Sequence, residues 1–306
     1  MKAFKLVLLA SAIAVLTLAC AATRIDIPAL SAGDDGAELP GKFVWHDLIT
    51  DTPAQTRAFY QQLFGWEFRP LPAGINYEMI YHRGVAIGGM VDQTRLPVQV
   101  DISQWIPVLA VADVDAAAAY FHANDGTVFT PPTSLGERGR LAVVADPQQA
   151  VLALLQTDGR DPRDAEAQEG GGNFLWVELW TTDAARASGF YAGLAPYRQQ
   201  TREMQVDTQT IDYHVLETAG RPRAGIRSKP IAELPPHWVS YLSVEGEDAL
   251  AQILARVEGL GGRVLVPATP RAQGGSVALI SGPSGAGIAL QTWPLQTASV
   301  AEEQVQ

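Results

Sequence analysis

Residues 50–66, TDTPAQTRAFYQQLFGW, contain the clearest structural signal in the chain. Thr52 is predicted to cap a helix at its N-terminus, and Gln55 stands where the second partner of a capping box is expected. Gly65 follows an apolar helix face and is predicted to end the helix. Residues 43–49, directly before it, have strand character, so the first unit is a strand followed by a helix.

This unit occurs a second time in the chain. Residues 42–48 (KFVWHDL) match residues 173–179 (NFLWVEL), and Phe59-Tyr60 matches Phe190-Tyr191 at the same spacing. Later matches lie at slightly larger spacings, as loop insertions would produce. The chain is therefore an internal duplication, and in each copy the order strand, helix, strands is predicted twice.

The patterning divides the chain into six parts. A charged, Gly-rich stretch separates the two copies, and an Ala-, Gly- and Pro-rich stretch without a sustained apolar period precedes the first. The predicted parts are a signal peptide (1–20), a flexible tether (21–40), domain 1 (41–157), a linker (158–172), domain 2 (173–294) and a polar tail (295–306).

The N-terminus is predicted to direct export. Lys2 and Lys5 precede an apolar core, residues 6–18, that is too short to span a bilayer. Cys20 follows small residues in a pattern that resembles a bacterial lipobox, which predicts lipidation of Cys20 and a place in the cell envelope, facing the periplasm. Simple signal cleavage, an uncleaved anchor and a free thiol are the alternatives. A single cysteine allows no intramolecular disulfide.

Charge and composition restrict the partners. The formal net charge is −11 and the basic residues are scattered, so nucleic acid is not an expected partner. We expect a small-molecule ligand, membrane contact through the N-terminal lipid only, and a monomer or a homodimer.

The motifs resemble those of a known family. Residues 50–53, Phe59-Tyr60, residues 63–66, residues 111–115 and Asp146-Pro147 follow the rhythm of vicinal-oxygen-chelate domains (glyoxalase, bleomycin-resistance and dioxygenase type), once per copy. The resemblance implies an α+β fold with two tandem domains. Each domain would pair two βαβββ modules into a curved, half-open barrel around a small-molecule cavity. In metal-dependent members, His, Gln or Glu residues of this cavity hold a divalent ion.

The metal-ligand positions of the family are occupied here by side chains that cannot bind a divalent ion. These positions correspond to Trp45, Ile106 and Ala153 in domain 1 and to Trp176, Val239 and Ala289 in domain 2, with a further position near Gly89-Met90. We therefore expect no cofactor, and a divalent ion on ligands outside the pattern stays open. Of the five histidines, His46, His122 and His237 are expected at the surface or with satisfied partners, and His82 or His214 could reach Asp47 or Glu178 through domain pairing.

A different side-chain set is predicted to line each cavity. Alternation along the strand puts Trp45 and Asp47 on one face, and Trp176 and Glu178 on the equivalent face. An indole beside a carboxylate suits a flat or cationic ligand. Tyr77 and Tyr213 align with each other and would add a hydroxyl, and Asp47 and Glu178 are candidate general bases. The alternative is that the tryptophans are core packing and the acids cap a sheet edge.

Three functions follow from this pattern. The first is an exported binding protein for a small hydrophobic or aromatic molecule. The second is an enzyme of the lyase, isomerase or dioxygenase kind that uses an off-pattern metal or a carboxylate base. Glutathione-dependent glyoxalase activity is the least expected, because the chain is predicted to be exported. The third is a tethered scaffold whose cavities are filled by its own tryptophans.

Overall fold

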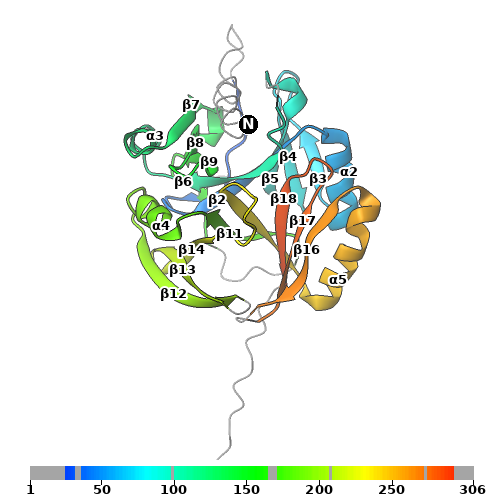
Figure 1. Cartoon of the computed structure of the whole chain (residues 1–306). Coiled ribbons are helices and arrows are strands. Elements are labelled where there is room, and N and C mark those ends of the chain that lie inside the picture. Colours follow the sequence, from blue (N-terminus) through cyan, green and yellow to red (C-terminus); the bar gives the residue numbers. More distant parts are fainter. Residues whose placement is uncertain are drawn as a thin grey trace, which may run out of the picture.

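The computed structural model describes residues 25–31, 36–97, 100–164, 171–206, 209–271 and 274–292. The predicted signal peptide, Cys20 and the polar tail lie outside the described residues. None of the described helices is long and apolar enough to cross a membrane. Each copy of the duplication forms one eight-stranded sheet, with domain 1 above domain 2 in Figure 1.

The described part of domain 1 contains two α-helices and one mixed sheet. Its elements are β2 (Phe43–Thr50), α2 (Pro53–Phe64), β3 (Glu67–Pro70), β4 (Glu78–His82), β5 (Val85–Asp92), β6 (Gln104–Ala110), α3 (Val114–Ala123), β7 (Thr127–Ser134), β8 (Arg140–Ala145) and β9 (Val151–Gln156). The strand order is β3-β4-β5-β2-β6-β9-β8-β7.

Domain 2 repeats this arrangement. Its elements are β11 (Phe174–Thr181), α4 (Ala184–Ala192), β12 (Arg198–Val206), β13 (Gln209–Thr218), β14 (Arg221–Ser228), β15 (His237–Val244), α5 (Gly246–Val257), β16 (Arg263–Pro270), β17 (Ser276–Ser281) and β18 (Gly287–Thr292). The order β12-β13-β14-β11-β15-β18-β17-β16 matches that of domain 1 strand for strand.

Strand pairing divides each sheet into two βαβββ modules. In domain 1, β2 pairs with β5 in parallel, β6 pairs with β9 in parallel, and the antiparallel pair β2–β6 joins the modules. The equivalent pairs in domain 2 are β11–β14, β15–β18 and β11–β15. The predicted α+β fold of tandem domains with paired modules is confirmed, and the curved sheets do not close into barrels.

The first helix shows which local predictions hold. Thr52 occupies the N-cap of α2 and Gly65 ends the helix in the left-handed conformation with φ of 71°, both as predicted. The predicted capping box is wrong, because the Thr52 side chain accepts no capping hydrogen bond. Instead the Thr50 hydroxyl accepts from the Thr52 N–H at 3.1 Å and bonds the Thr56 hydroxyl at 2.8 Å.

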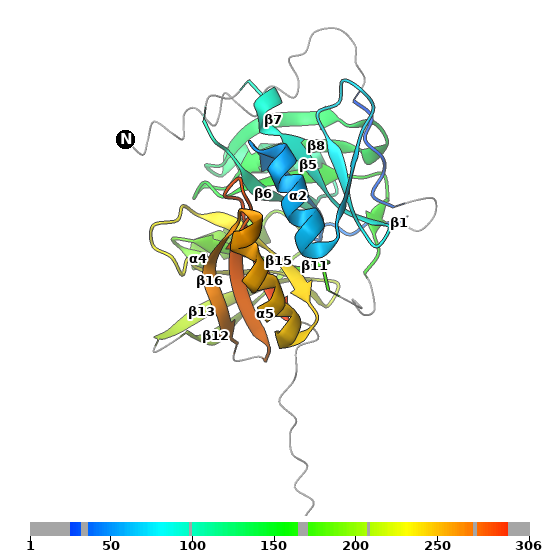
Figure 2. The ribbon, with the colours of Figure 1, turned by 90° about the vertical axis from the view of Figure 1, so that its right-hand side faces the viewer.

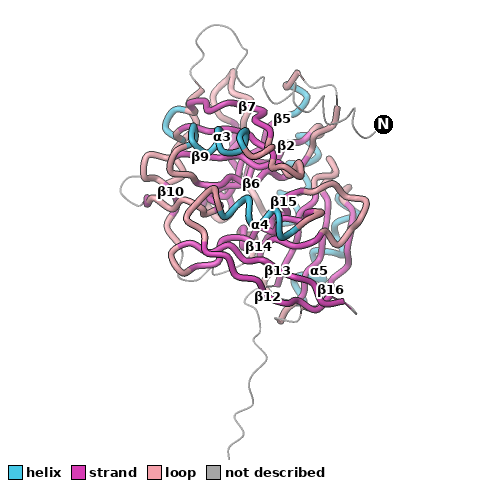
Figure 3. Tube along the Cα trace, turned by 60° about the vertical axis from the view of Figure 1, so that its left-hand side comes forward, coloured by secondary structure: helices cyan, strands magenta, loops and turns pink. Residues whose placement is uncertain are grey.

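The helices pack between the two sheets. Buried residues of α2 and α5 belong to one shared core, and these helices lie side by side in Figure 2. Buried residues of α3 and α4, the helices labelled in Figure 3, belong to a second shared core. The Tyr120 hydroxyl there donates to the Phe190 carbonyl at 2.8 Å. The opposite face of each sheet carries a separate cluster from its own domain. The two candidate cavities therefore lie on opposite faces of the molecule.

The segments predicted as tether and linker are partly packed. Ile27 is buried in the apolar cluster of domain 1, and its N–H donates to the Leu135 carbonyl at 2.9 Å. Further along, β1 (Gly36–Ala37) pairs with β10 (Asp161–Pro162). The described parts of residues 21–40 and 158–172 are therefore attached to the folded chain, by apolar side chains and by backbone pairing.

Candidate functional site

A buried carboxylate is the centre of the candidate site in domain 2. Glu178, on β11, is fully buried. Its Oε1 accepts from the Trp180 indole at 2.7 Å and from the Tyr241 hydroxyl at 3.1 Å. Its Oε2 accepts from the Tyr213 hydroxyl at 2.9 Å and lies 3.6 Å from the Arg271 guanidinium. These contacts replace the water that a charged group loses on burial.

A glycine makes room for this arrangement. Gly225 lies opposite Glu178 on the neighbouring strand β14. A Cβ at this position would overlap the Tyr213 hydroxyl and approach the Trp176 indole to 3.2 Å. The Trp176 indole N–H also donates to the Tyr213 hydroxyl, at 3.1 Å. The structure therefore brings Trp176, Glu178 and Tyr213 together, as expected, and Gly225 allows it.

Domain 1 carries the same arrangement. The Asp47 carboxylate accepts from the Tyr77 hydroxyl at 2.5 Å and from the Trp45 indole at 3.0 Å. Gly89 lies opposite Asp47 on β5, and a Cβ there would overlap the Tyr77 hydroxyl. Both copies thus combine a tryptophan, a carboxylate, a tyrosine and a glycine in one contact group. Their functional role stays a prediction.

Burial changes the proton affinities of these groups. Burial raises the pKa of Asp47, although the bonds from Tyr77 and Trp45 and the charge of Arg138 oppose the change. Burial and the neighbouring carboxylates raise the pKa of Tyr77 and Tyr213 well above the usual tyrosine range. The tyrosines therefore keep their protons and act as donors. A general-base role for Glu178 would require one of its donors to move aside.

In domain 1 the face around Asp47 is occupied by the protein itself. Ile27 packs into the same cluster as Trp45 and Tyr77. The Arg138 guanidinium lies 4.4 Å from the Trp45 ring centroid and donates to the Pro28 carbonyl at 2.6 Å. The N-terminal segment thus packs over this face of domain 1. Trp45 and Trp176 are instead among the lining residues of a second cavity, between the domains.

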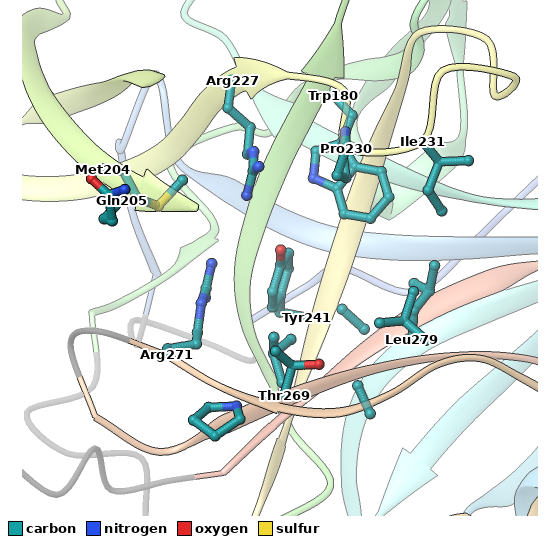
Figure 4. A pocket seen from close by; sticks show the side chains of 15 residues that line it. Trp180, Met204, Gln205, Arg227, Pro230, Ile231, Tyr241, Thr269, Arg271 and Leu279 are labelled. Atoms are coloured by element: carbon teal, nitrogen blue, oxygen red, sulfur yellow. The ribbon is translucent and has the colours of Figure 1, made fainter. Parts of the chain in front are cut away.

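In domain 2 the corresponding face is hollow. A cavity of about 410 Å³ lies there, within the size range of small-molecule sites. Its apolar lining is formed by Trp180, Met204, Pro230, Ile231, Val266, Val277, Leu279 and Ala289. Its polar lining includes Arg227, Tyr241, Thr269 and Arg271 (Figure 4).

The sequence interpretation missed most of this lining. Trp176 and Tyr213, expected to line the cavity, are not among its lining residues and instead support Glu178. Trp180 lines the cavity, and the alternation that grouped Trp176 with Glu178 could have identified it. Arg271 comes from the β16–β17 connection, where sequence periodicity contains no information on side-chain direction.

The residues at the family's metal positions do not fit a divalent ion. The structure places Val108 between Trp45 on β2 and Ala153 on β9, so this stretch of the face is built from groups without hard donors. In domain 2, Ala289 on β18 lies beside Tyr241. The described residues contain no group of three or more His, Cys, Asp or Glu side chains that could hold a metal. Neither set of positions therefore offers a divalent ion the nitrogen or carboxylate ligands that it requires.

The histidines lie away from both carboxylates. His82 is 3.4 Å from the Asn173 side-chain oxygen, and His214 bonds the Thr201 hydroxyl at 3.0 Å. Among the described residues, neither contacts Asp47 or Glu178. His46 is buried between the domains, where it bonds the Ser240 hydroxyl at 2.9 Å. Burial lowers the pKa of His46 to about 3, so it is neutral there.

A second cavity, of about 660 Å³, lies between the first strands of the two domains. Asp164 bonds Arg223 at 2.5 Å and lies 3.2 Å from Lys42. Arg221 lies 3.7 Å from the same carboxylate, so Lys42, Arg221 and Arg223 share Asp164 as their common partner at this cavity.

Comparison with known proteins finds relatives that match most of the chain. No family model matches it. It is 30% identical over 278 residues to the anthracycline biosynthesis protein DnrV of Streptomyces peucetius, with 82% of this chain and 93% of DnrV covered. It is 28% identical over 245 residues to CFP32 of Mycobacterium tuberculosis, provisionally named a glyoxylase, with 79% and 91% covered.

A solved structure has the same fold. The Mn(II)-bound glyoxalase from Novosphingobium aromaticivorans superimposes with a TM-score of 0.57 over 83% of each chain. The sequences are only 14% identical, so this likeness concerns the fold alone.

Proposed function

Because the chain belongs to the vicinal-oxygen-chelate superfamily, we propose that it binds a small hydrophobic or aromatic molecule in the cavity of domain 2, without the metal site of the family. The observation that carries the proposal is the cavity of about 410 Å³ above Glu178. Its walls are mostly apolar, and a few polar groups converge at one side, as is typical of small-molecule sites.

The buried hydrogen-bond group prepares this cavity for a ligand. Glu178 accepts from Trp180 and Tyr241, and both of these side chains also line the cavity. Each is therefore held in one orientation before a ligand arrives. Preorganised side chains lose less conformational freedom on binding, which favours affinity.

An enzymatic function is the second candidate. The name of DnrV connects that relative with anthracycline biosynthesis, and CFP32 is provisionally named a glyoxylase. These names support a lyase, isomerase or dioxygenase that uses an off-pattern metal or a carboxylate base. In this second candidate, a divalent metal would bind ligands outside the metal positions of the family. Elemental analysis after gel filtration separates the two functions, because a stoichiometric divalent metal would contradict the metal-free binding protein.

Binding is tested with the neutral fluorescent probe N-phenyl-1-naphthylamine. We expect saturable binding of one equivalent to the purified protein. Ile231→Trp adds bulk at a half-buried position of the cavity lining and should weaken binding at least tenfold.

Leu265→Trp is the matched control. Leu265 is 42% exposed and is not a lining residue, so binding should not change. Equal affinity of wild type and Ile231→Trp, with both folded by thermal unfolding, would refute the cavity as the binding site.

Export is a separate part of the proposal. We propose that Cys20 carries a lipid that holds the protein in the cell envelope, facing the periplasm, as a monomer or a homodimer. The basic, apolar and small-residue pattern of residues 1–20 supports this. Cys20→Ser should release the protein from the membrane fraction, and retention there would refute lipidation.

A further inference from the structure

The cavity of domain 2 has a basic end and an apolar end. The guanidinium groups of Arg227 and Arg271 point toward each other on one side of the cavity (Figure 4). Trp180, Ile231 and Leu279 lie on the other side. Two cations that converge in a partly apolar cavity repel each other, and an anion between them removes this repulsion.

The equivalent positions in domain 1 are apolar. On β14, Arg227 pairs with Trp180 of β11. The equivalent residue on β5 is Val91, which pairs with Ile49 of β2. Arg271 follows β16 directly, as Leu135 follows β7. The pair of arginines is thus particular to domain 2, whereas domain 1 has the single Arg138 on the equivalent face.

The charges of this end are only partly balanced. The Arg271 Nη2 atom lies 3.6 Å from Glu178, and its Nη1 donates to the Gln291 side-chain oxygen at 2.8 Å. Gln291 is itself buried, so it holds the guanidinium in one orientation. Among the described residues, no carboxylate lies within 4.0 Å of the Arg227 guanidinium, whose Nε donates to the Ser228 carbonyl. Within this distance, Glu178 is therefore a partner of Arg271 and not of Arg227.

We propose that the ligand of domain 2 is an aromatic or hydrophobic anion. Its carboxylate, phenolate or sulfonate group binds between Arg227 and Arg271, and its apolar body packs against Trp180. This inference rests on the proposed function and adds the chemical class of the ligand. Guanidinium groups bind such oxygens with two parallel hydrogen bonds, and the surrounding apolar walls strengthen the attraction.

Domain 1 contains an internal example of this binding mode. Arg138, from the β7–β8 connection that corresponds to the position of Arg271, donates to the Pro28 carbonyl oxygen at 2.6 Å. The adjoining Ile27 side chain packs into the apolar cluster. Arg138 thus binds a backbone oxygen next to the apolar side chain of Ile27, as the domain 2 arginines would bind the charged oxygens of a ligand with an apolar body.

The test compares two probes that share one skeleton. The anion 8-anilinonaphthalene-1-sulfonate differs from neutral N-phenyl-1-naphthylamine by its sulfonate group. The full-length wild type should bind the anionic probe about tenfold more tightly than the neutral probe, because one charge-assisted hydrogen bond contributes about that factor. Arg271→Gln should lower affinity for the anion about tenfold and leave affinity for the neutral probe unchanged. Arg227→Gln should act in the same way.

Two further variants control for charge and folding. Arg263→Gln removes an exposed arginine of the same domain outside the cavity lining and should change neither affinity. Arg271→Lys keeps the charge and should restore part of the affinity for the anion. A variant counts only if its thermal unfolding is cooperative, and Arg227→Gln provides the test if Arg271→Gln does not fold.

The outcomes distinguish the inference from the proposed function. Equal affinities for both probes, with no selective effect of either arginine variant, would refute the anion site and leave the binding function standing. Failure of both probes to bind would refute the binding function, and the anion site with it.

Discussion

The two domains share a buried centre and differ at its rim. Asp47 in domain 1 and Glu178 in domain 2 each accept hydrogen bonds from a tyrosine and a tryptophan opposite a glycine. Around Asp47 the face carries one arginine, Arg138, and is covered by the segment of Ile27, whereas around Glu178 two arginines line an open cavity. The two domains therefore differ in the residues around the carboxylate. These residues are covered in domain 1 and line an open cavity in domain 2.

The centres also differ in how many donors they have. Asp47 relies on Tyr77 and Trp45, with Arg138 nearby as a charge. The longer side chain of Glu178 also reaches Tyr241 on the next strand, β15. Loss of one donor should therefore matter more in domain 1.

The largest expected effect is that of Gly89→Ala. The added methyl group displaces the Tyr77 hydroxyl and leaves the half-buried Asp47 with one hydrogen-bond donor fewer. We expect a loss of about 3 kcal/mol in the free energy of unfolding, and about 1.5 kcal/mol for Gly225→Ala, because Glu178 keeps other donors. Urea unfolding of both variants measures the difference.

A helix glycine is the control for this pair. Gly189 lies in α4, and a Cβ there meets no atom within 4 Å. Gly189→Ala should therefore stabilise the protein by about 0.5–1 kcal/mol. Equal losses for Gly89→Ala and Gly225→Ala would contradict the proposed difference between the two centres.

The next effect concerns the cover of domain 1. Ile27→Asp places a charge where the apolar cluster excludes water, so the N-terminal segment should leave the domain 1 face. We expect a loss of about 2 kcal/mol in the free energy of unfolding. The stoichiometry of N-phenyl-1-naphthylamine should rise from one to two equivalents in a fluorescence titration.

Val85→Asp is the control for the added charge, because Val85 is 64% exposed. It should change neither stability nor stoichiometry. If Ile27→Asp is folded but still binds a single equivalent, then the N-terminal segment is not what closes domain 1.

The smallest expected effect is at the contact between the domains, where His46 of domain 1 stands in place of Val177 of domain 2. Burial lowers the pKa of His46 to about 3 in the folded protein, below its usual value near 6.5. Between these pH values the unfolded chain binds the additional proton, so stability is lost as the pH falls. From pH 6.5 to 5.5 this amounts to about 1 kcal/mol.

His46→Val makes domain 1 resemble domain 2 at this position. The variant should lose this part of the acid dependence, as measured by urea unfolding at several pH values. His122→Val, at an exposed helix end, is the control and should keep it. An unchanged slope in His46→Val would show that His46 does not set the acid dependence.

Parts of the candidate site could be predicted because they are local. Trp45 and Asp47 lie two residues apart on one strand, and alternation places them on one face. Tyr77 and Tyr213 were linked to them by the internal repeat. The structure brings these groups into contact as expected, although their functional role stays a prediction.

Other parts could not be predicted. Arg227 and Arg271 come from β14 and from the β16–β17 connection, at opposite sides of the sheet order, and meet only because the sheet curves. The docking of Ile27 depends on an apolar surface that several strands form together. Neither contact has a signal in the local sequence.

The duplication, the order of the elements and the face of each strand that carries the carboxylate follow from the chain alone, because they depend on residue spacing and on neighbours along the chain. The packing of Ile27 over domain 1, and the domain 2 cavity with its two converging arginines, follow only from the three-dimensional arrangement. Such contacts join residues far apart in the chain, and sheet curvature and packing set their distances.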